Sequence, residues 1–160
     1  MKDPPDDVSD GEVLSRILKD IRRLRGQTAQ ETAGRMNMSL RTYERFEAGG
    51  TRLNQDYLHR FARATDSDAN GILLAIVVRA PDFAIDGADN QLATVLTSGM
   101  SRFVRTQGSA IALLSARDVL EITGEMFSAL DRKIEEARLA RSLIAEGQAD
   151  LAATRPRPGR

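Results

Sequence analysis

Residues 28–49, TAQETAGRMNMSLRTYERFEAG, predict two short helices that are separated by a tight turn. Thr28 and Glu31 form the T-x-x-E pattern of a capping box, which begins a helix by satisfying its unpaired backbone N–H groups. Asn37 tolerates the left-handed backbone conformation that a tight turn requires. Ser39 follows as the cap of a second helix. The stretch therefore predicts a helix-turn-helix.

The two motif helices are expected at about 28–36 and 39–47. In the second helix Tyr43 and Phe46, three residues apart, are predicted to point into a core. The other positions of that helix point outward and include Leu40, Arg41, Glu44 and Arg45. Because the major groove of DNA admits one α-helix, a polar outer face near a helix N-terminus is typical of a base-reading helix.

Further positions at fixed spacing accompany this pattern. They are Arg22, Arg25, Gly26, Thr28, Glu31, Ala33, Met36, Asn37, Met38, Ser39, Thr42, Glu47 and Gly49, followed by Leu58, Arg60, Ala62 and Ala64. Together they resemble the XRE family, the Cro and phage-repressor type of helix-turn-helix DNA-binding proteins, over about residues 12–78. The chain departs from the family at three positions. Ala29 replaces a phosphate-binding Gln, Thr32 replaces a buried Leu and is expected to loosen the core locally, and Asn37 replaces the turn Gly.

The expected DNA contacts fall into two groups. For base edges, Arg41 presents a planar fork suited to guanine, Arg45 lies one turn later, and Leu40 can pack on a thymine methyl group. Glu44 either accepts from cytosine or pairs with a neighbouring Arg. The alternative for both arginines is an ordinary solvated surface. For the sugar–phosphate backbone, the resemblance implies contacts from Gln30, Ser39 and Thr42. Arg52 and Asn54, in the loop after the second helix, are further candidates, and Thr28 is a DNA-binding candidate at the start of the first helix. The resemblance also implies a structural ion pair between Arg22 and Glu47.

Charge is distributed unevenly, although the chain is neutral overall. Residues 12–65 carry eleven basic and six acidic residues, a net charge of +5, whereas residues 1–11 carry a net charge of −3. The basic excess coincides with the helix-turn-helix, where phosphate binding requires positive charge. A basic solvated surface is the alternative explanation.

The hydrophobic pattern predicts an all-α protein with a five-helix repressor-like domain and a helical extension. The expected parts are a disordered acidic N-terminus at 1–11, the DNA-binding domain at 12–80, a helical region at 81–153 and a disordered tail at 154–160. Outside the motif, helices are expected at about 12–25, 55–64, 68–79, 91–106 and 109–153. Residues 81–90 are expected to be a turn-rich linker after Pro81, and Gly124 is a possible break in the last helix.

The region 91–151 carries enough apolar residues to predict a homodimer or a protein partner. Phe127, Leu130 and Ile134 follow 3–4 spacing, and the heptad is broken at Arg141 and Gln148. A repressor that binds a palindromic operator as a homodimer is the first interpretation. The alternative is a protein-interaction module that binds a toxin, RNA polymerase or another protein while the helix-turn-helix recruits it to DNA.

Other classes of protein are not indicated. The chain has no Cys and one His, His59, and it lacks CxxC, HExxH, GxGxxG and P-loop patterns. We therefore expect neither an enzyme nor a protein with a metal or cofactor. The longest apolar run is too short to span a bilayer. These features predict a cytoplasmic, nucleoid-associated protein.

Overall fold

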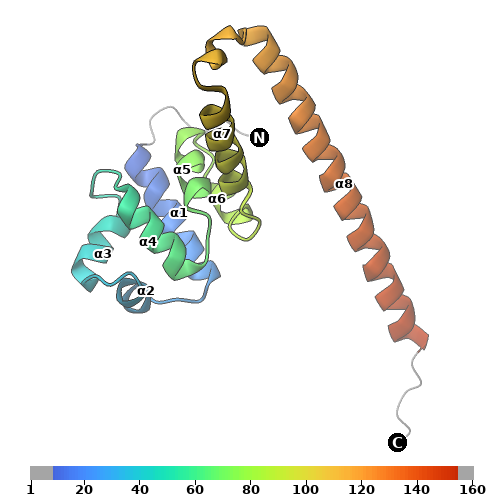
Figure 1. Cartoon of the computed structure of the whole chain (residues 1–160). Coiled ribbons are helices and arrows are strands. Elements are labelled where there is room, and N and C mark those ends of the chain that lie inside the picture. Colours follow the sequence, from blue (N-terminus) through green and yellow to red (C-terminus); the bar gives the residue numbers. More distant parts are fainter. Residues whose placement is uncertain (1–8, 155–160) are drawn as a thin grey trace, which may run out of the picture. The chain divides into compact units, whose positions relative to one another are not determined.

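The computed structural model describes residues 9–154, and every regular element within that range is a helix. The chain therefore has the predicted all-α fold (Figure 1). The disorder expected for residues 1–8 and for the tail 155–160 lies outside the described residues. The chain divides into two compact units, Met1–Thr106 and Gln107–Arg160, which are described separately below.

Seven helices begin in the first unit, and their bounds follow the predicted pattern closely up to the fifth helix. They are α1 (Asp10–Leu24), α2 (Ala29–Arg35), α3 (Leu40–Glu47), α4 (Gln55–Thr65), α5 (Ala69–Val77), α6 (Pro81–Asp86) and α7 (Leu92–Gln107). The first five helices are capped by the side chain directly before each of them, including Ser9 for α1 and Asp68 for α5. Local hydrogen bonding therefore explains where these helices begin.

The core of the first unit is built around the apolar stripe of α1. Ile17, Leu18 and Ile21 are fully buried at helical spacing, and α1 contacts α3, α5 and α6. From the other side, Phe46 of α3 packs edge-to-face against Phe61 of α4, with ring centroids 6.4 Å apart. Side chains of α2 and α3 are part of this aliphatic and aromatic core, and their packing holds the two helices in place.

The predicted linker at 81–90 is wrong for its first six residues, which form α6. Pro81 occupies the first turn of that helix, where the missing N–H costs nothing because it would be unpaired in any case. Ala84 is buried, and Phe83 and Ile85 pack against the core, so α6 contacts both α1 and α5. The compact unit therefore continues past the boundary at 80 that was expected from the sequence.

A buried carboxylate connects α7 to the rest of the first unit. Asp68, 3% exposed, caps α5 and also accepts hydrogen bonds from the backbone N–H of Thr94 at 3.0 Å and its hydroxyl at 2.7 Å. Asn70 donates to the same hydroxyl at 2.8 Å. These bonds fix the first turn of α7, while Met100 and Val104 further along it are exposed.

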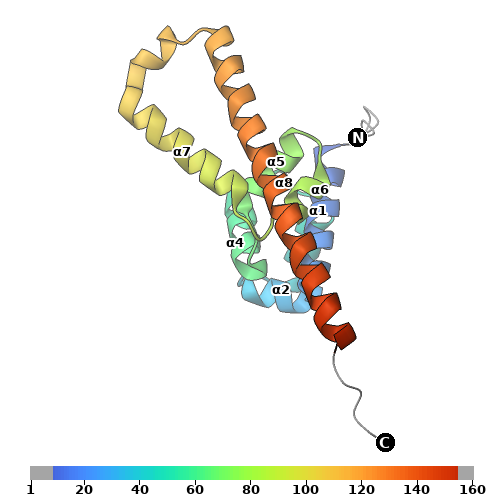
Figure 2. The ribbon, with the colours of Figure 1, turned by 90° about the vertical axis from the view of Figure 1, so that its right-hand side faces the viewer.

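The second unit consists of a 3₁₀ helix, η1 (Gly108–Leu113), and the long helix α8 (Ala116–Thr154). Gly108, which directly follows the last residue of α7, has a φ of 55°, a conformation that favours glycine and ends the helix. Ser115 and Asp118 then cap the start of α8. Gly124 does not divide the helix, because α8 runs without a break through it (Figure 2).

Candidate nucleic-acid interface

The capping box predicted at the start of α2 is present. The backbone N–H of Thr28 donates to Glu31 Oε2 at 2.7 Å, and the N–H of Glu31 donates to Thr28 Oγ1 at 3.2 Å. Both bonds satisfy N–H groups that have no partner within the helix. The first motif helix is therefore set by residues three apart in the sequence.

The turn between α2 and α3 has the left-handed residue that was expected. Asn37 has a φ of 53°, its N–H donates to the carbonyl of Gly34, and the N–H of Met38 donates to the carbonyl of Ala33. This pair of bonds is a Schellman ending, in which Asn takes the place of the usual Gly. Ser39 then accepts from the N–H of Thr42 at 3.3 Å and begins α3.

α3 has the buried and polar faces that the sequence predicts. Tyr43 and Phe46 are fully buried, whereas Arg41, Glu44 and Arg45 are exposed. Leu40 and Thr42 are half-buried at the N-terminal end of the same helix. The side chains proposed to reach base edges therefore lie together on the outside of α3.

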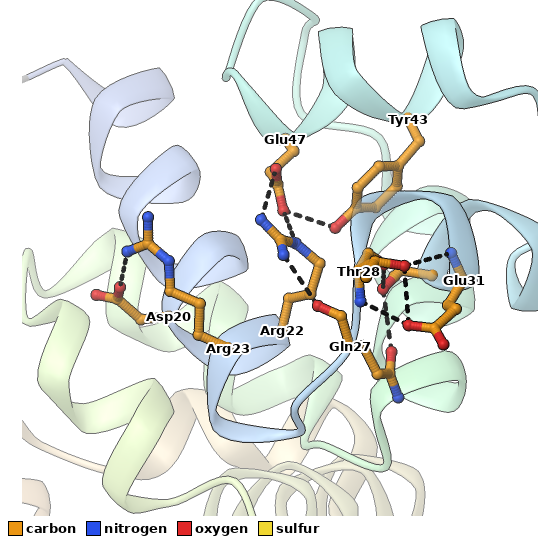
Figure 3. Close-up of polar contacts among 9 residues, drawn as sticks. Asp20, Arg22, Arg23, Gln27, Thr28, Glu31, Tyr43 and Glu47 are labelled. Carbon is orange, nitrogen blue, oxygen red and sulfur yellow. Dashed lines mark hydrogen bonds and ion pairs between the residues drawn. The ribbon is translucent and has the colours of Figure 1, made fainter.

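A buried polar cluster anchors the inner face of α3 to α1 (Figure 3). Glu47 accepts from Arg22 Nε at 2.6 Å and from Arg22 Nη2 at 3.3 Å, which is the ion pair that the family resemblance implied. The hydroxyl of Tyr43 donates to the same carboxylate at 2.7 Å, and Arg22 also donates to the carbonyl of Gln27 at 3.0 Å. Glu47 is 7% exposed, so this carboxylate depends on its donors in the interior.

The cluster affects the ionisation of two of its members. The hydrogen bond to Glu47 raises the pKa of Arg22 above its ordinary value, so this guanidinium stays charged. Burial, followed by the hydrogen bond to Glu47, raises the pKa of the Tyr43 hydroxyl well above its ordinary range. Tyr43 is therefore a neutral donor to a charged pair. Periodicity predicts Tyr43 only as a core residue, although its i,i+4 spacing from Glu47 is a usable signal for this hydrogen bond.

Thr32, which replaces a buried Leu, does not leave an unpaired polar group in the core. Its side chain is fully buried, and its hydroxyl is 3.0 Å from Gln27 Oε1 and 3.0 Å from the carbonyl of Thr28. Gln27 also donates to the carbonyl of Ala64 at 3.1 Å, so it links α2 to the end of α4. Gln27 is therefore a structural residue, although it belongs to no pattern in the sequence that predicts this role.

Several of the proposed phosphate contacts already serve as helix caps. Asn54 caps α4 by accepting from the N–H groups of Asp56 and Tyr57, and the hydroxyls of Ser39 and Thr42 lie 2.8 Å apart. Arg52, by contrast, is an exposed cation in the loop after α3. At the capped helices a phosphate can be bound by the backbone N–H groups of the helix N-terminus. Arg52 can instead bind a phosphate through the charge of its side chain.

The N-termini of α2 and α3 differ in their electrostatics. The first turn of α3 contains no acidic residue, so its backbone N–H groups and Arg41 together favour an anion. In α2 the hydrogen bonds from the backbone and hydroxyl of Thr28 hold the pKa of Glu31 below its ordinary value. That ionised carboxylate opposes a phosphate near Thr28 and Gln30, both of which are exposed. The N-terminus of α3 is therefore a better anion site than the N-terminus of α2.

The residues proposed for a dimer or partner contact lie in the second unit, on α8. Phe127 is 53% exposed and Ile134 is 49% exposed, with Leu130 half-buried between them. Their 3–4 spacing places them on one side of the helix, as expected. The described residues contain no helix both long and apolar enough to cross a membrane. Within that same range, no group of three or more His, Cys, Asp or Glu side chains is placed to bind a metal ion.

Comparison with protein families, curated proteins and solved structures finds no match to this chain.

Proposed function

We propose that this protein is a sequence-specific, double-stranded-DNA-binding transcriptional regulator of the XRE type, which acts as a homodimeric repressor on a palindromic operator. The observation that carries this proposal is the pair of exposed arginines, Arg41 and Arg45, one turn apart on the outer face of α3. A guanidinium fork matches guanine O6 and N7 in the major groove.

The inner face of α3 gives this arrangement its rigidity. Tyr43 and Phe46 are packed in the core, and Glu47 is tied to Arg22 of α1. A base-reading side chain needs such a fixed helix, because misplacement of the backbone would change every contact that the helix makes. The N-terminus of α3, which lacks an acidic residue in its first turn, adds a favourable field for phosphate.

The homodimer follows from the small number of base contacts that one α3 can make. Three or four side chains of one recognition helix read only a short site, so two copies on two half-sites are needed for useful specificity. Such a dimer would bind a site whose two-fold symmetry matches its own. The net charge of +5 over residues 12–65 supports the phosphate contacts on each half-site.

The decisive experiment selects bound fragments from genomic DNA and then compares variants on the selected site. Arg41→Ala should cost about 1–3 kcal/mol and relax the preference at one base position, because a bidentate base contact is lost. Arg52→Ala should weaken binding to all sequences about equally, as expected for a phosphate contact. Arg132→Ala, an exposed arginine of α8, is the control and should change neither. Full discrimination by Arg41→Ala would refute the placement of the recognition helix.

The salt dependence of binding provides an independent check. Several phosphate contacts should give log K a slope of several negative units against log salt, because bound counterions are released. Arg52→Ala should reduce that slope by about one unit. A flat profile would exclude this electrostatic mode of binding.

The exposed apolar side chains of α8 favour one second candidate, a protein-interaction module. In that case α8 binds a toxin, RNA polymerase or another protein, and the helix-turn-helix recruits it to DNA. A double variant, in which Phe127 and Ile134 are both replaced by Glu, distinguishes the two functions. A homodimeric repressor should then lose operator affinity, whereas a recruiting module should retain it and lose its protein partner.

A further inference from the structure

Helix α8 has an apolar seam that follows the 3–4 spacing of a heptad repeat. Exposure along this seam is high, at 74% for Leu120, 53% for Phe127, 49% for Ile134 and 61% for Ile144. The seam positions between Leu120 and Gln148 are Leu120, Thr123, Phe127, Leu130, Ile134, Ala137, Arg141, Ile144 and Gln148. A surface of this kind requires a partner, because exposed apolar area of such length promotes association.

The seam is close to a mirror image of itself about the point between residues 135 and 136. Reversal about that point places Phe127 opposite Ile144 and Ile134 opposite Ala137. It also places the polar Thr123 opposite Gln148. A helix with this pattern matches its own reversed copy in most layers, and the pair of Leu130 with Arg141 is the exception.

We propose that α8 pairs with α8 of a second copy of this chain in an antiparallel arrangement, centred between residues 135 and 136. This inference deepens the homodimer of the proposed function by naming the contact and its direction. Dimerisation through α8 is measurable without DNA. A failure of this pairing can therefore be distinguished from a failure of the proposed DNA-binding function.

Charge argues against the parallel arrangement. Two parallel helices in register would place Arg141 against Arg141 of the second copy within the seam. They would also bring Lys133 beside Arg138 of the second copy on both flanks of the pair. Like charges in those positions disfavour association. In the antiparallel arrangement Arg141 instead lies opposite Leu130, over which its long aliphatic stem can extend.

Charge also selects the register of the antiparallel pair. With the centre between residues 135 and 136, Asp131 of each copy flanks Arg138 of the other, giving two ion pairs related by the two-fold axis. A shift of one heptad in one direction would bring Asp131 beside Asp131, and a shift in the other would bring Arg138 beside Arg138. Arg138 has an exposed neighbour in its own helix, Glu135, at 2.7 Å. An exposed pair at i,i+3 is weak enough to be rearranged.

The first experiment measures the dimer dissociation constant of the full chain by sedimentation equilibrium, without DNA. Asp131→Arg and Arg138→Asp should each weaken dimerisation about tenfold, because two attractive contacts become repulsive. The double variant, which reverses both charges, should restore the original dissociation constant. Arg132→Asp, on the outer face of the same helix, is the control and should have no effect. Additive weakening in the double variant would overturn the proposal.

An apolar pair of variants locates the seam on the helix. Ile134→Ser should weaken dimerisation, whereas Leu139→Ser, on the opposite side of α8 and 62% exposed, should leave it unchanged. Equal effects of the two substitutions, or a full chain that stays monomeric, would overturn the proposal.

Disulfide cross-linking determines the direction, since the chain contains no Cys of its own. The proposed register places Leu130 opposite Arg141 of the second copy. A mixture of Leu130→Cys and Arg141→Cys should therefore form a covalent dimer on oxidation, and neither variant should do so by itself. A covalent dimer from Leu130→Cys alone would indicate parallel helices and refute the proposal.

Discussion

Helices α1 and α8 both carry apolar residues at helical spacing, yet their surroundings differ completely. In α1, Ile17, Leu18 and Ile21 are fully buried by helices from other parts of the first unit. In α8, Leu120 and Ile144 remain 74% and 61% exposed. The hydrophobic pattern of a helix therefore indicates which of its faces requires burial. It does not indicate whether that face is buried by other helices of the same chain.

The largest effect is expected at the polar cluster that joins α1 to α3. Glu47→Ala leaves the half-buried Arg22 without its counter-charge and the buried Tyr43 hydroxyl without its acceptor, so the free energy of unfolding should fall by about 3–5 kcal/mol. Glu44→Ala on the exposed face of the same helix is the matched control and should change stability by less than about 0.5 kcal/mol. Thermal melting measures both. An unchanged midpoint for Glu47→Ala would mean that this contact does not support the first unit.

The next effect concerns the close approach of two backbones at the end of α3. Gly49 has a φ of 71°, and a Cβ there would lie 2.1 Å from the carbonyl oxygen of Gly11. Gly49→Ala should cost about 2–4 kcal/mol, because strain from the positive φ adds to the clash. Gly34→Ala has nothing within 4 Å of its new Cβ and should stabilise α2 by about 0.5–1 kcal/mol. Urea denaturation of both variants tests whether opposite signs are observed.

A smaller, pH-dependent effect is expected at Asp68, which joins α5 to α7. Burial by itself would raise the pKa of Asp68, but hydrogen bonds from Thr94 and from the N–H groups of Asn70 and Gly71 outweigh it and hold the pKa below its ordinary value. A lowered pKa in the folded state stabilises the protein fully above the unfolded pKa of about 3.9, and this stabilisation is lost as pH falls through the folded pKa.

Asp68→Asn should therefore reduce stability by about 1–3 kcal/mol at pH 7, since bonds to a charged acceptor are lost. The difference between the two proteins should begin to shrink below about pH 4, where Asp68 becomes protonated in the unfolded chain, and should be lost once the pH falls below the lowered pKa of the folded state. Urea denaturation at pH 7 and at pH 3 provides the comparison. A difference that is the same at both pH values would show that the charge of Asp68 does not matter.

The smallest effect is expected within α8. Gly124 lies inside an exposed helix with nothing within 4 Å of a new Cβ, so Gly124→Ala should stabilise α8 by about 0.5–1 kcal/mol. Amide hydrogen exchange should slow in α8 and remain unchanged in α1, because the two helices belong to separate compact units. Equal slowing in both helices would show that the two units unfold together.

The sequence by itself determined the local structure of the helix-turn-helix. Thr28 and Glu31 define the start of α2, Asn37 supplies the left-handed turn, and Ser39 begins α3. Each of these bonds joins groups only a few residues apart, so a side chain and its spacing are enough to predict it. The burial of Tyr43 and Phe46 followed in the same way from their periodicity.

Only the tertiary structure decided how distant segments meet. The sequence predicts a linker where α6 lies, because a proline can mark either the end of one helix or the start of the next. The burial of α6 depends on contacts with α1, which is far away in the sequence. The bond from Gln27 to the carbonyl of Ala64, and the bond from Thr94 to Asp68, likewise join groups that lie far apart in the sequence. Such contacts arise from packing, which residue spacing along one segment does not contain.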